Sequence, residues 1–119
     1  MAETNDWQEI GTLEDIPRLG ARVIHTRHGD IAVFRTALDQ VFALRDRCPH
    51  RGGPLSQGIV HGRRVTCPLH NLVLELDSGE AVAPDTGCTR SFPVRLEGER
   101  VLLQVGNVVE MSASRADCA

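Results

Sequence analysis

Two short segments of this 119-residue chain each pair one thiol with one imidazole. The first is Cys48-Pro49-His50 and the second is Cys67-Pro68-Leu69-His70, with sixteen residues between His50 and Cys67. Thiolates and neutral imidazoles are ligands that transition metals bind well. The residue types and their spacing therefore predict a metal centre to which each segment supplies one Cys and one His.

The even split between the segments favours an iron–sulfur cluster of mixed ligation. Most such clusters are held by four thiolates, whereas the Rieske variant of the [2Fe–2S] cluster replaces two of them with His on one of its two irons. We expect Cys48 and Cys67 to bind the inner iron. His50 and His70 would then bind the outer iron.

This ligand set predicts one-electron transfer. Two ferric ions, two sulfides, two thiolates and two neutral imidazoles together carry no net charge, whereas four thiolates would leave the oxidised cluster doubly negative. An added electron therefore costs less, and Rieske potentials lie at about −150 to +300 mV, against about −400 mV for plant-type clusters. The added electron also favours a proton on the outer imidazoles.

Other uses of the same residues are less consistent with the spacing. A zinc site of two Cys and two His is the strongest alternative, but zinc sites usually pair Cys with Cys and His with His. Two disulfides, or unligated Cys and His in the core, are also open. Cys88 and Cys118 have no His at loop spacing, so we expect free thiols there. His61 is interpreted as a surface histidine.

The elements that must position these residues are predicted to be strands. Short β-branched or aromatic runs separated by turn residues indicate strands at 21–25, 31–35, 41–45, 72–76, 92–96 and 101–105. The first three form a predicted meander, and Glu97-Gly98-Glu99 is a predicted hairpin turn. The one helical candidate is 13–16, which Pro17 closes. The fold class is therefore all-β. The segment from Arg47 to Thr66 is expected to be a long functional loop.

The length and composition of the chain limit its possible domain organisation and its possible partners. We expect a single domain at 1–106, with cluster-binding loops within 46–84, and a mobile tail at 107–119. The net charge of −3, with all thirteen cations being Arg, argues against a nucleic-acid partner. Neither a secretory signal nor a membrane-spanning run is visible, so the predicted location is the cytoplasm, without a membrane partner.

The two ligand segments resemble those of the Rieske-type ferredoxin superfamily. That resemblance implies three layered antiparallel sheets with a cluster-binding subdomain. The stretches 48–58 (CPHRGGPLSQG) and 65–71 (VTCPLHN) are similar to the small-subunit family of assimilatory NAD(P)H-dependent nitrite reductase. This likeness extends from Trp7 to Val105.

Two departures separate the chain from other branches of the superfamily. Rieske proteins of cytochrome bc type have an extra cysteine in each loop and a Tyr near the cluster, whereas the matching positions here are Gly53 and Leu69 and the chain has no Tyr. Ferredoxins of aromatic-ring dioxygenases usually continue the second loop with a Gly and, further on, an aromatic residue. Here Asn71-Leu72-Val73-Leu74 follows His70.

The resemblance also implies a partner. In the nitrite reductase family, a large subunit carries the flavin, the sirohaem and a [4Fe–4S] cluster, so nitrite would not bind this chain. The chain would support the six-electron reduction of nitrite to ammonium as a one-electron relay, without catalysis of its own. The alternative is a free-standing Rieske ferredoxin that delivers single electrons to an oxygenase.

Five arginines crowd the two ends of the predicted cluster region: Arg45, Arg47, Arg51, Arg63 and Arg64. Such a basic collar would steer an acidic partner toward the outer histidines. The ordinary alternative is a solvated surface of isolated ion pairs.

Overall fold

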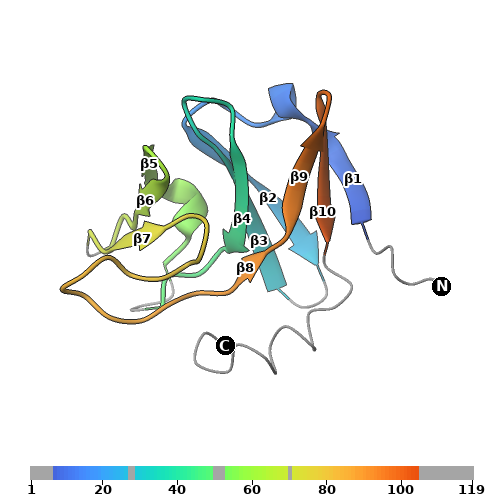
Figure 1. Cartoon of the computed structure of the whole chain (residues 1–119). Coiled ribbons are helices and arrows are strands. Elements are labelled where there is room, and N and C mark those ends of the chain that lie inside the picture. Colours follow the sequence, from blue (N-terminus) through green and yellow to red (C-terminus); the bar gives the residue numbers. More distant parts are fainter. Residues whose placement is uncertain (1–6, 27–28, 50–52, 70, 105–119) are drawn as a thin grey trace.

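Three antiparallel sheets build the structure, which is a computed structural model describing residues 7–26, 29–49, 53–69 and 71–104 (Figure 1). The outer sheet has the order β1-β10-β9, the middle sheet β2-β3-β4-β8, and the loop-side sheet β5-β6-β7. The strands are β1 Trp7–Thr12, β2 Gly20–Thr26, β3 Gly29–Arg35, β4 Val41–Arg45, β5 Ile59–His61, β6 Arg64–Thr66, β7 Val73–Glu75, β8 Ser91–Phe92, β9 Val94–Glu97 and β10 Arg100–Gln104. The all-β class and the three antiparallel layers are thus confirmed.

The middle sheet is buried on both faces because successive side chains of a strand point to opposite sides. Ile31, Val33 and Ala43 pack with residues of the outer sheet. The intervening Ala32, Phe34 and Leu44 pack with residues of the loop-side sheet. Two separate apolar cores therefore flank the middle sheet, which lies between the other two sheets in Figure 1.

The predicted meander is present as β2, β3 and β4, and the hairpin at Gly98 joins β9 to β10. The predicted strand at 92–96 is in fact two strands. Pro93 lacks the N–H that a continuous ladder requires, and there the chain leaves the middle sheet and enters the outer sheet. Phe92 pairs with Ala43 of β4, and Val94 pairs with Leu103 of β10.

The segment from Arg47 to Thr66 is more regular than the long loop expected from its sequence. It contains the 3₁₀ turn η3 (Leu55–Gln57), β5 and β6. The helical candidate near the N-terminus is only a second 3₁₀ turn, η2 (Leu13–Asp15). Within the described ranges, no helix has the length and apolar character needed to cross a bilayer. The predicted tail, 107–119, lies outside the described residues, so it and the domain boundary stay predictions.

Candidate metal centre

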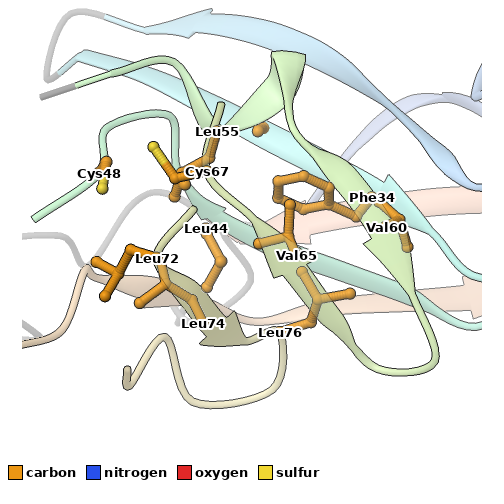
Figure 2. Packing of buried hydrophobic residues seen from close by; sticks show 11 residues of the cluster. Phe34, Leu44, Cys48, Leu55, Val60, Val65, Cys67, Leu72, Leu74 and Leu76 are labelled. Carbon is orange, nitrogen blue, oxygen red and sulfur yellow. The ribbon is translucent and has the colours of Figure 1, made fainter. Parts of the chain in front are cut away.

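Cys48 and Cys67 form no disulfide, and both are buried in the core between the middle and loop-side sheets. Their exposed fractions are 2% and 0%. Figure 2 shows them toward one end of this core, opposite Phe34 and Val60. The two predicted thiolate ligands therefore lie in the same part of the fold, although they are nineteen positions apart in sequence.

Each cysteine is the first residue of a loop, and a hydrogen bond from its own backbone amide to the last residue closes that loop. The N–H of Cys48 donates to the carbonyl of Gly53 at 2.7 Å, and the N–H of Cys67 donates to the carbonyl of Leu72 at 2.8 Å. Both hydrogen bonds join residues five positions apart. We call the segments 48–53 and 67–72 the first and second loops. By sequence, His50 lies within the first loop and His70 within the second.

The two loops come together at Gly53. A Cβ atom at this position would lie 2.6 Å from Leu69 Cδ1, 2.8 Å from Leu69 Cγ and 3.5 Å from Cys67 Sγ. Only a residue without a side chain lets the first loop approach the second this closely. Gly53 therefore sets the spacing between the backbone of one loop and the sulfur of the other.

Gly53→Ala should destabilise the chain by about 1–3 kcal/mol, because the new methyl group overlaps Leu69. Leu69 is half exposed (52%), so removing its side chain alone should cost little. The double variant Gly53→Ala/Leu69→Ala should recover most of the loss. Urea unfolding, together with iron and acid-labile sulfide per chain, measures both effects. A double variant that is no more stable than Gly53→Ala would show that this contact does not set the spacing.

Two hydrogen bonds join the residues on either side of the first loop, and we call this pair the Asp46–Ser56 clamp. The amide of Ser56 donates to Asp46 Oδ1 at 2.7 Å, and the Ser56 hydroxyl donates to Asp46 Oδ2 at 2.8 Å. Asp46 itself is anchored to β3, because its amide donates to the carbonyl of Asp30 at 2.9 Å. Leu55, beside Ser56, is fully buried in the core. The first loop is thereby fixed to the middle sheet before and after the cysteine.

The second loop turns through a left-handed residue. Asn71 has φ 58°, a conformation that Asn and Gly adopt more readily than other residues. Its amide donates to the carbonyl of Cys67 at 3.1 Å. Asn71 stands where dioxygenase ferredoxins usually have a Gly. The left-handed backbone conformation explains this difference, because both Asn and Gly adopt it readily.

The two predicted imidazole ligands, His50 and His70, lie outside the described residues, as do Arg51 and Gly52 of the first loop. Among the residues that the structure does describe, no three His, Cys, Asp or Glu side chains are grouped so as to hold a metal ion. His61 is exposed on β5, and its Nε2 lies 2.7 Å from Thr66 Oγ1. The assignment of all four ligands therefore stays a prediction.

One cysteine prediction is wrong. Cys88 is disulfide-bonded, not a free thiol. The absence of a His at loop spacing does not distinguish a free thiol from a disulfide, and the sequence carries no other pairing signal for Cys88. Cys118, which was expected to be a free thiol as well, lies outside the described residues.

The ligand atoms in the described part of the site suit an iron–sulfur centre. Two sulfurs are brought into one buried region, on two loops closed by hydrogen bonds, and each loop has an imidazole in its sequence. A model of the Rieske-like [2Fe-2S] domain matches residues 6–104. The chain belongs to the Rieske-like [2Fe–2S] domain family. Its cofactor is accordingly a Rieske-type [2Fe–2S] cluster.

Several similar proteins are small ferredoxins that match this chain over nearly their whole length. The anthranilate 1,2-dioxygenase ferredoxin subunit of Burkholderia cepacia is 36% identical over 106 residues, which cover 85% of this chain and 94% of that protein. The ferredoxin of carbazole 1,9a-dioxygenase from Nocardioides aromaticivorans IC177 has a TM-score of 0.74 at 21% identity. The superposed region covers 84% of this chain and 98% of that ferredoxin. A protein assigned as an NADPH nitrite reductase small subunit has a TM-score of 0.74 at 20% identity, with 83% and 98% covered. These likenesses make the chain an electron-transfer domain of the Rieske type.

Proposed function

We propose that this chain is the electron-transfer small subunit of a cytoplasmic NAD(P)H-dependent nitrite reductase and supports the reduction of nitrite to ammonium. The observation that carries the proposal is the sequence of the two loops. The stretches 48–58 and 65–71 resemble that family continuously, beyond the ligands themselves. The solved structure that is assigned as a nitrite reductase small subunit has the same fold, which supports the proposal.

Cys48, His50, Cys67 and His70 hold the cluster in this proposal. When bound, the cluster supplies a site that accepts and releases one electron. The buried positions of Cys48 and Cys67 keep water from the sulfur side. Pro49, Pro68 and Leu69 are exposed around the loops and offer an apolar rim against which a partner can pack.

A second candidate function is that of a free-standing ferredoxin for an oxygenase. It is favoured by the 36% identity to the Burkholderia cepacia ferredoxin subunit, which spans nearly all of that protein. The conformation of Asn71 removes one objection to it, because a Gly in oxygenase ferredoxins would serve the same left-handed turn. The two candidates share the cluster and differ only in the partner.

Co-purification separates the two candidates. The tagged chain is purified from its native cells, grown on nitrite, and the protein bound to it is identified. We expect a chain with the visible absorption of sirohaem, and nitrite-dependent oxidation of NAD(P)H that stops when the small subunit is removed and resumes when it is returned. Recovery of a non-haem iron oxygenase, without sirohaem, would reject the nitrite reductase assignment in favour of the second candidate.

A further inference from the structure

A cleft of about 550 Å³ lies directly beside the first loop. One wall is formed by Arg45, Arg47, Cys48 and Pro49, and the other by 87–89. The walls are close, because a Cβ atom at Gly87 would lie 3.7 Å from Pro49 Cβ. The cleft therefore opens next to one of the predicted thiolate ligands.

Positive charge gathers at this cleft. Arg47 is exposed, and it forms no ion pair with any described residue. The guanidinium of Arg45 lies over Gly29, where a Cβ atom would be 3.0 Å from Arg45 Nη2. Arg90 is buried nearby, and burial, followed by the charge of Arg45, lowers its pKa from the usual value. Arg45 and Arg90, whose backbones are joined by a hydrogen bond of 2.8 Å from the Arg45 amide to the Arg90 carbonyl, thus lie close enough for their charges to interact.

The acidic groups around the cleft are engaged elsewhere or lie at its edge. Asp46 accepts the two hydrogen bonds from Ser56, and Asp30 Oδ1 lies 2.8 Å from His25 Nδ1. Glu80 lines a neighbouring cleft that shares Gly87 and Cys88 with this one. Among the described residues, those that line the cleft include two arginines and no carboxylate.

Two other arginines of the predicted basic collar differ from Arg47. Arg63 Nη2 lies 3.4 Å from Asp77 Oδ2, and Arg63 also stacks on Phe42 at 5.3 Å from the ring centre. Arg64 Nη2 lies 3.2 Å from Glu75 Oε2. These two arginines are neutralised within the loop-side sheet, and Arg51 lies outside the described residues. Within the described residues, Arg63 and Arg64 therefore do not contribute unpaired positive charge to the expected collar.

We propose that the cleft between Arg47 and the segment 87–89 receives an acidic side chain of the electron-transfer partner, beside Cys48. The proposal rests on the electron-carrier function proposed above, and it names the chemistry of the partner surface. The chain as a whole is negative, at −3, so a local positive cleft also orients it on an acidic partner.

Small redox ions test the cleft without any assumption about the partner. The holoprotein is reduced by one electron per chain, and stopped-flow absorption follows its oxidation by hexacyanoferrate(III), an anion that becomes hexacyanoferrate(II). A second series uses the cation tris(phenanthroline)cobalt(III), which becomes cobalt(II). The variants are Arg47→Glu and, as a matched control with the same charge change, Arg64→Glu.

Arg47→Glu should slow the anionic oxidant about fivefold at low ionic strength and speed the cationic one, with both effects fading at high salt. A shift in the cluster potential would move both rates in the same direction, so opposite signs identify an electrostatic effect on approach. Arg64→Glu should change either rate less than twofold. Equal effects of the two variants, or no effect of Arg47→Glu, would overturn the proposal.

The protein that co-purifies with the wild-type chain provides the second arm. Arg47→Glu should weaken its binding at low salt at least as strongly as it slows the anion, and Arg64→Glu should not. If the small-ion result holds but the partner contains no sirohaem, the nitrite reductase assignment fails and the cleft stands. If the sirohaem protein binds both variants equally, the cleft proposal fails and the function stands.

Discussion

Replacing Cys67 by alanine should abolish cluster binding. The sulfur of Cys67 is fully buried beside Gly53, so no water or exposed side chain can take its place as a ligand. We expect iron and acid-labile sulfide to fall from two of each per chain, the content of a [2Fe–2S] cluster, to background. Alanine is chosen over serine because it leaves no hydroxyl group unsatisfied in the core. Metal analysis, sulfide analysis and visible absorption of anaerobically prepared protein measure the loss.

Two further variants keep this prediction open to rejection if Cys67→Ala folds poorly. Cys48→Ala removes the other predicted thiolate and should give the same loss. Cys88→Ser removes a cysteine that is disulfide-bonded and not a predicted ligand, so its iron content should stay at the wild-type value. Full iron and sulfide in purified Cys67→Ala, or loss of iron in Cys88→Ser, would contradict the ligand assignment.

His70→Cys should keep a cluster but lower its potential by on the order of 100 mV or more, toward the range of clusters held by four thiolates. The reason is charge, because a thiolate in place of a neutral imidazole makes the reduced state more negative and harder to reach. Redox titration followed by electron paramagnetic resonance measures the midpoint potential.

His61→Cys is the matched control for this change. His61 is exposed on β5, and its ring contacts the hydroxyl of Thr66. The same substitution there should leave the potential unchanged. A potential that does not move in His70→Cys, or that falls equally in both variants, would remove His70 from the ligand set.

Much of the fold could be predicted because strands of the middle sheet carry a clear alternating or apolar pattern. β3 and β4 are recognisable from such runs, and they form the sheet on which both cores pack. β5 and β6 were missed because each has three residues and only one buried side chain, Val60 or Val65, which is too little for a periodic pattern. β1 was missed because its pairing shifts between Glu9 and Gly11, and this interrupts the alternation.

The kind of cofactor could be predicted from the sequence, whereas the contacts that set the spacing of the two loops could not. Paired Cys and His residues are visible in any sequence, whereas the role of Gly53 depends on the approach of Leu69 from a distant loop. The Asp46–Ser56 clamp has the same character, since two polar residues ten positions apart carry no sequence pattern that marks them as partners. The ion pairs of Arg63 and Arg64 likewise depend on the register of β6 with β7.

The most direct test of the mixed thiolate and imidazole ligation is pulsed electron paramagnetic resonance of the reduced protein grown with ¹⁵N-labelled histidine. Ligation by Cys48, Cys67, His50 and His70 predicts strong couplings from two histidine nitrogens, with one coupling lost in His70→Cys and none lost in His61→Cys. Iron without any strongly coupled histidine nitrogen, or a zinc ion in place of iron and sulfide, would contradict it.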